Sequence, residues 1–126
     1  DAKERFALTP LNIAMGIIRL ANKIKNTQTG REGNDPEVLI VAPAPIGPHY
    51  KEKNAFYSMG RESDVKTKEM IPFLEKLAAE GGFHFLSAGD HLAMGETDHM
   101  HLNETGHQKM AEILHKKIQE ILKDRR

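Results

Sequence analysis

The sequence predicts an α/β fold with a parallel sheet. Segments with the helical spacing of apolar residues alternate along the chain with two short, continuously apolar segments that are bounded by turn residues. Continuous apolar runs are typical of strands buried on both faces, and alternation with helices implies parallel strands joined by crossover connections. A chain of 126 residues, 39% hydrophobic and 29% charged, suits one globular domain of this class.

The first element is a helix predicted over residues 10–26. Thr9 is a good N-cap, and Pro10 suits the first helical position because its missing N–H has no partner there in any helix. The apolar residues that follow have helical spacing; they are Ile13, Ile17, Leu20, Ala21 and Ile24.

A buried strand is predicted over residues 37–42, and prolines at positions 43, 45 and 48 end it. From residue 44 to about 63 no periodicity is visible, although aromatic residues occur at positions 50, 56 and 57. A loop of roughly 20 residues is unusual in a compact domain and is often functional. We expect it to border a substrate cleft or a subunit contact, with Phe56 or Tyr57 at least partly buried. The alternative is a solvated insertion.

A second helix is predicted from Asp64, as its cap, to Gly81 and Gly82. Pro72 lies inside it and implies a kink or a restart, of which we favour the kink. A strand over residues 83–87 follows, then a polar loop to His101. The final helix is marked by apolar residues at helical spacing, namely Met110, Ile113, Leu114, Ile118, Ile121 and Leu122.

Two strands are too few for three amphipathic helices, because sheets commonly have about 4–6 strands. We therefore expect residues 1–126 to be the C-terminal half of an α/β domain, with further strands preceding Asp1.

Composition removes several classes of function. Lys plus Arg and Asp plus Glu both number 18, so no net field recruits nucleic acid. The absence of Cys excludes disulfides, thiolate metal sites and a Cys nucleophile. No apolar run approaches the roughly 20 residues of a membrane span.

Asp98 and His101 are the candidate catalytic residues. They lie after the last strand on a loop that enters a helix, where open α/β sheets place their ligands. Asp98 can hold one ring nitrogen of His101 while the other faces substrate, as in the acid–base half of a catalytic triad. In the simpler interpretation, Asp98 only caps a turn and His101 is a surface residue. The prolines of residues 43–48 are expected to shape a pocket rim at the same sheet edge.

A metal site is the other possibility here. Histidines 91, 99, 101 and 107 occur close together with Asp90, Glu96 and Asp98 between them, and these side chains suit zinc or iron. No H-E-x-x-H or comparable helical pair is present, so we assign no metal. A metal-dependent hydrolase stays open as a weaker alternative, which loss of activity with a chelator would support.

The final block carries a family resemblance. Residues 98–107, followed by Met110-Ala111 and Ile113-Leu114, resemble the last block of the SGNH hydrolases, also called GDSL esterases and lipases. Three other segments fall in register with that family: Asp1 with the residues up to Pro10, residues 38–46, and residues 70–87.

The resemblance implies the C-terminal half of a flavodoxin-like three-layer α/β/α sandwich that hydrolyses esters through an acyl-serine. It makes His101 the general base and Asp98 its orienter. The serine and the oxyanion donors belong to earlier blocks, and no serine of this chain (Ser58, Ser63, Ser87) has a Gly-Asp-Ser context. His99 stands where many relatives have Gly.

We therefore expect part of a serine esterase for small acyl esters, such as an acetylated carbohydrate or a short-chain lipid ester, with no cofactor. This chain alone is expected to be inactive. Its expected partners are the N-terminal segment of the same domain and a possible second copy in a homo-oligomer. The main rival is a non-catalytic α/β carbohydrate-binding module.

Overall fold

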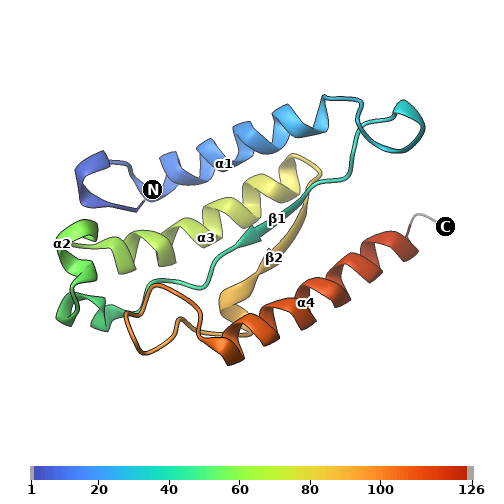
Figure 1. Ribbon diagram of the computed structural model, residues 1–126. Coiled ribbons are helices and arrows are strands. Elements are labelled where there is room, and N and C mark those ends of the chain that lie inside the picture. The colour runs from blue at the N-terminus through green and yellow to red at the C-terminus, as the bar shows by residue number, and fades with distance from the viewer. Residues whose placement is uncertain (1, 125–126) are drawn as a thin grey trace.

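The computed structural model describes residues 2–124, and Asp1, Arg125 and Arg126 lie outside the described residues. The expected match of Asp1 with an earlier block of the SGNH hydrolases therefore falls on a residue outside the described ones. The elements follow one another as helix, strand, two short helices, helix, strand and helix (Figure 1). Their bounds are α1 Pro10–Lys25, β1 Leu39–Ala42, a 3-10 helix Pro48–Glu52, α2 Ala55–Met59, α3 Ser63–Glu80, β2 His84–Ser87 and α4 Glu104–Lys123. Three further single-turn 3-10 helices are Glu4–Phe6, Arg31–Gly33 and Ala88–Asp90.

The two strands pair in parallel, as the sequence predicts. Leu39 lies opposite His84, and Ala42 lies opposite Ser87. Both strands therefore end at the same edge of the sheet, and the chain segments that follow them start side by side. This edge positions the candidate site.

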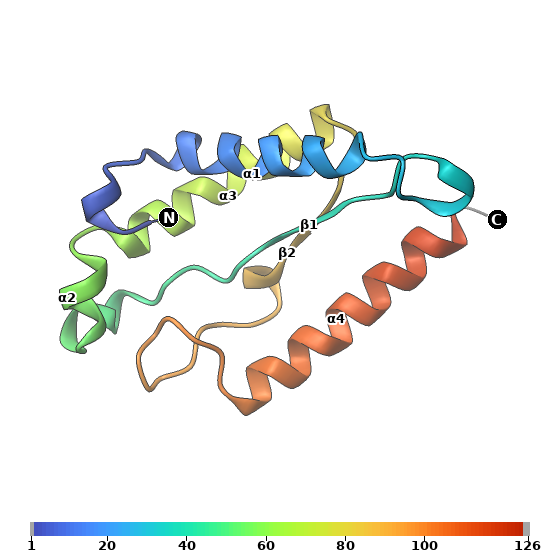
Figure 2. The ribbon, with the colours of Figure 1, turned by 45° about the horizontal axis from the view of Figure 1, so that its top comes forward.

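The helices lie on both faces of the strands. α1 and α3 pack against each other and cover one face, and α4 runs along the opposite side (Figures 1 and 2). The α/β class and the three-layer α/β/α arrangement are thus confirmed.

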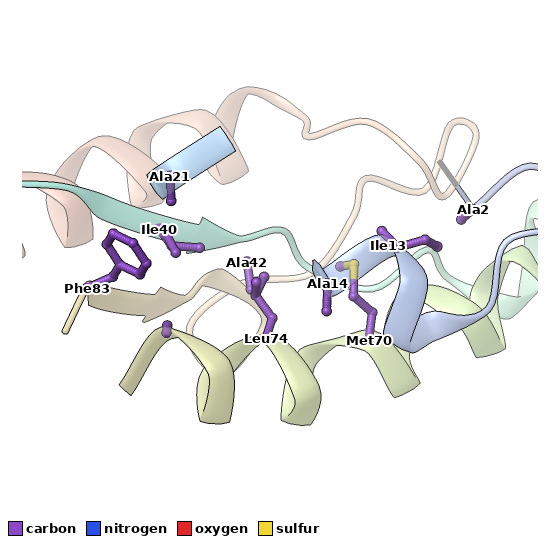
Figure 3. Packing of buried hydrophobic residues seen from close by; sticks show 10 residues of the cluster. Ala2, Ile13, Ala14, Ala21, Ile40, Ala42, Met70, Leu74 and Phe83 are labelled. Atoms are coloured by element: carbon purple, nitrogen blue, oxygen red, sulfur yellow. The ribbon is translucent and has the colours of Figure 1, made fainter. Parts of the chain in front are cut away.

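The core lies between the sheet and the α1/α3 layer (Figure 3). Leu74 of α3 is fully buried there, against the inward-facing side chains of β1, Ile40 and Ala42. Truncating a buried leucine to alanine typically costs about 2–5 kcal/mol. The remaining buried members of this core are Ala2, Ile13, Ala14, Ala21, Met70, Ala78 and Phe83.

The start of α1 is the predicted one. The Thr9 hydroxyl accepts a hydrogen bond from the backbone N–H of Asn12 at 3.1 Å, and the Asn12 side-chain oxygen accepts from the Thr9 N–H at 3.3 Å. This reciprocal pair satisfies two backbone donors and fixes the first turn.

The start of α3 differs from the prediction. Glu62, with a left-handed φ of 63°, precedes the helix, and Asp64 lies inside its first turn. The Asp64 carboxylate instead pairs with the Lys51 ammonium at 3.3 Å, so its role as a cap is wrong. α3 is one element through Pro72, which rules out a restart at that position.

Residues 44–63 are more ordered than the sequence predicts, because they hold the 3-10 helix Pro48–Glu52 and α2. Their buried aromatic is Tyr50, whose hydroxyl donates to the Gly60 carbonyl at 2.6 Å. Phe56 is half-buried, which confirms one expectation, whereas Tyr57 is 88% exposed. Helices of five residues are too short to show an apolar period.

Helix α4 packs loosely against the sheet. Gly106 is the one buried position among the described residues of α4, and all four residues of β2 are half-buried. Ile118 and Leu122 of α4 are about half exposed.

None of the described helices has the length and apolar character that crossing a membrane requires.

Candidate active site

Two segments meet at the carboxyl edge of the sheet. The segment after β1 reaches Gly47, whose N–H donates to the carbonyl of His99 at 2.9 Å. His99 belongs to the turn 95–101 that follows β2, so the proline-containing rim predicted from residues 43–48 lies against the candidate catalytic turn. Two short backbone hydrogen bonds close that turn: the His99 N–H donates to the Gly95 carbonyl at 2.9 Å, and the Gly95 N–H donates to the His101 carbonyl at 2.7 Å.

Asp98 binds both the backbone and the imidazole of this turn. Its Oδ1 accepts from the N–H groups of Met100 at 2.9 Å and His101 at 3.0 Å. Its Oδ2 accepts from Nδ1 of His101 at 2.6 Å, which confirms the predicted contact. The hydrogen bond from the His101 ring, followed by those from the Met100 and His101 N–H groups, lowers the pKa of Asp98 to about 2. The carboxylate is therefore ionised at neutral pH.

The His101 ring is held on one side and open on the other. Because Nδ1 donates to Asp98, the lone pair lies on Nε2, and the side chain is 77% exposed. The following helix begins at once, with the Asn103 side chain capping it through the Gly106 N–H at 2.8 Å. An oriented base facing solvent can take a proton from a bound hydroxyl group.

A cleft of about 610 Å³ lies between the turn and the segment 44–63. Asp98, Thr97 and Met100 form one wall, and residues 52–55 form the other. The expected proximity of the segment 44–63 to the candidate site is therefore present. The cleft has the size of a small-molecule site, and most of the side chains around it are polar.

The four histidines of the metal alternative diverge. His91 lines a groove between β2 and α4, and His107 is an exposed residue in the first turn of α4. The His99 ring lies against His49 rather than against His101. Among the residues described, no group of three or more His, Asp or Glu side chains is arranged to hold a metal ion.

The hydroxyl groups of Ser58 and Ser63 bind backbone carbonyls rather than the imidazole. The Ser63 hydroxyl is buried and donates to the Ala2 and Met59 carbonyls at 3.0 and 2.9 Å, and the Ser58 hydroxyl donates to the Ala55 carbonyl at 3.1 Å. Within residues 2–124, no hydrogen bond joins a serine to His101.

Sequence reasoning missed the roles of two residues of the rim, His49 and Glu52. The His49 and His99 rings lie 5.4 Å apart between centroids, and Nδ1 of His49 is 3.0 Å from the Glu52 carboxylate. The dense prolines next to Gly47 marked a rim, but no spacing rule pairs a histidine with another 50 residues away.

The fold and the Asp–His pair at its carboxyl edge define the class: the chain resembles the C-terminal portion of an SGNH hydrolase, as its final block predicts. Two solved structures carry the likeness. An aryl esterase of M. smegmatis is 25% identical with a TM-score of 0.85 over 95% of this chain. The carbohydrate acetylesterase Est24 of Sinorhizobium meliloti is 27% identical with a TM-score of 0.86 over 96%. This chain spans 56% of the length of each. No family model and no curated protein matches the sequence.

Proposed function

We propose that this chain is part of a serine ester hydrolase and supplies the base and its orienter, His101 and Asp98. The observation that carries the proposal is the 2.6 Å contact between Oδ2 of Asp98 and Nδ1 of His101, with the ring otherwise exposed and Asp98 lining a cleft. The esterase and acetylesterase activities of the similar structures support the same reaction class.

His101 acts twice in the proposed reaction. Its Nε2 first takes the proton of a serine hydroxyl while the serine oxygen bonds to the ester carbonyl carbon, and Asp98 stabilises the imidazolium that forms. The same proton then passes to the leaving alcohol as the carbonyl–oxygen bond breaks. In the second half His101 activates a water molecule, which releases the acid and restores the serine.

The nucleophilic serine is proposed to come from an N-terminal segment of the same domain. Two features support this: no hydrogen bond joins Ser58 or Ser63 to His101, and this chain spans only 56% of the length of each similar structure. In this arrangement the oxyanion donors come from that segment as well.

The proposed substrate is an acetylated carbohydrate. Glu52, Lys53, Asn54 and Thr97 line the cleft beside Asp98 and can hydrogen-bond a hydroxyl-rich alcohol. A short-chain lipid ester has few groups to match them. Est24, one of the similar structures, is a carbohydrate acetylesterase, which favours the same substrate class.

The test compares three esters on the full-length protein: an activated acetyl ester, an acetylated sugar and a short-chain lipid ester. We expect turnover of all three that is lost in His101→Ala, with the highest kcat/KM for the sugar and no effect of a chelator. Sugar binding without turnover of any ester would establish the carbohydrate-binding module instead. Inhibition by the chelator would establish the metal-dependent alternative.

A further inference from the structure

His99 has an unusual backbone conformation at a sensitive position. Its φ of 60° lies in the left-handed region, which a residue with a β-carbon enters at a steric cost. Such residues persist when their surroundings hold them firmly. His99 lies between Asp98 and His101, so any relaxation of its backbone moves the imidazole relative to its carboxylate.

Contacts from the segment after β1 hold His99 in place. Besides the backbone hydrogen bond from Gly47, the His99 side chain lies directly on Gly47. A β-carbon at position 47 would be 3.0 Å from the His99 β-carbon and 3.1 Å from its Nδ1, closer than carbon atoms normally approach. The His49 ring covers the His99 ring at a tilt of 51°.

His49 is itself fixed by a charged neighbour. The hydrogen bond from Nδ1 of His49 is the main cause that lowers the pKa of Glu52, so the Glu52 carboxylate stays charged and keeps the ring in place. Glu52 also lines the cleft that contains Asp98. A continuous set of contacts thus runs from Glu52 in the wall of the cleft, through His49 and His99, to the turn 95–101 that carries His101.

We propose that His99 is a positioning residue of the esterase: its side chain, lodged between Gly47 and His49, fixes the turn 95–101 so that His101 keeps its bond to Asp98. The expected effect on kcat rests on the proposed function, whereas the expected effect on the hydrogen bond between His101 and Asp98 rests on the geometry alone. His99 touches no substrate in this assignment and acts through His101.

The test uses Gly47→Ala, which adds one methyl group against His99 at an ordinary extended backbone position (φ −69°, ψ 143°). We expect kcat of the full-length protein to fall about ten- to hundredfold with KM nearly unchanged, because small displacements of a catalytic group have effects of this size. The matched control is Gly16→Ala on α1, where a β-carbon meets nothing within 4 Å and kcat should not change.

Rescue separates this role from general damage. In Gly47→Ala/His99→Gly the clash and the strained β-carbon are both removed, and we expect kcat to return to that of His99→Gly alone. A second pair tests the ring contact: His49→Phe, which keeps a ring over His99, should retain more kcat than His49→Ala. Failure of the double variant to recover, or equal losses in the two His49 variants, would overturn the proposal.

A spectroscopic readout makes the inference independent of activity. A short hydrogen bond between an imidazole and a carboxylate gives a strongly downfield proton signal, here from Nδ1 of His101. The signal should disappear or shift in Gly47→Ala, and in the double variant it should match that of His99→Gly alone. If the wild type has this signal but no esterase activity, the proposed function fails while the positioning role stands. An unchanged signal and kcat in Gly47→Ala would refute the positioning role. If Gly47→Ala does not fold, the same proton signal is compared between His49→Phe and His49→Ala, and this comparison tests the positioning role.

Discussion

At the scale of single residues, Asp98 joins backbone folding to side-chain orientation. One carboxylate oxygen holds two N–H groups of the turn, and the other holds the His101 ring. The turn and the acid–base pair therefore form together, and the geometry of the pair is fixed within four residues. This local character is why the sequence alone predicts it.

Substitution of His101 and its neighbours should have graded effects on the full-length protein. His101→Ala should lower kcat on the order of 10³-fold or more because the base is lost, while the stability changes little for so exposed a side chain. Asp98→Asn should lose about 10²–10³-fold because the ring tautomer is no longer fixed. His99→Ala keeps its backbone bonds and should lose at most about tenfold. Steady-state kinetics check this order. A greater loss of kcat in His99→Ala than in His101→Ala would show that His101 is not the base.

The Asp98 carboxylate also predicts an acid-dependent stability. Its pKa falls from 3.8 to about 2 on folding, so its contribution is complete above about pH 4 and is lost as the pH falls through about 2. Urea unfolding should show a stability gap between wild type and Asp98→Asn that is steady from pH 5 to 4 and narrows from pH 4 toward 2. A gap that is unchanged over this lower range would mean that the carboxylate is not held as described.

At the scale of elements, the segment 44–63 is an anchored wall of the site rather than an inert insertion. Tyr50→Phe removes the hydroxyl that binds the Gly60 carbonyl and accepts the Ser63 N–H, leaving buried groups without a partner. We expect a loss of about 1–3 kcal/mol in the free energy of unfolding. Tyr57→Phe is the matched control, because that side chain is 88% exposed and no change is expected. Equal stability of the two variants would show that the segment is not anchored through Tyr50.

The elements that the sequence predicts correctly are those with local signals. Thr9 and Pro10 mark the start of α1, and the continuous apolar run marks β1. The failures depend on distant partners: Asp64 has a good capping side chain, but Lys51 pairs with it. Tyr50 is buried by contacts with Gly60 and Ser63 that no periodicity records.

The candidate site divides in the same way. The Asp98–His101 pair is contained in one turn and is visible in the sequence, and the family resemblance assigns its roles. The contact of His99 with Gly47 and His49 depends on the parallel pairing of β1 and β2, which brings two distant segments to one edge. Such a contact follows only from the register of the sheet.

At the scale of the whole molecule, the α4 side of the sheet is half covered, and several large apolar residues of α1 are exposed as well. Leu20 of α1 is 63% exposed and Ile24 is 50% exposed. Residues 1–126 expressed alone are therefore expected to aggregate through strand edges and apolar faces. Co-expression with an N-terminal segment should restore a soluble particle in size-exclusion chromatography. A soluble monomer of residues 1–126 that is active without a companion would refute the proposed division of the domain.

The most direct test of the account is the intact mass of the protein after mixing with an activated acetyl ester. The full-length protein is expected to gain one acetyl group rapidly, and His101→Ala is expected to gain it on the order of 10³-fold more slowly. Residues 1–126 alone are expected to gain none at matched concentration, because the proposed serine lies elsewhere. Acetylation of His101→Ala at the wild-type rate, or rapid acetylation of a serine within residues 1–126, would contradict the assignment of His101 as the base for a serine supplied by another segment.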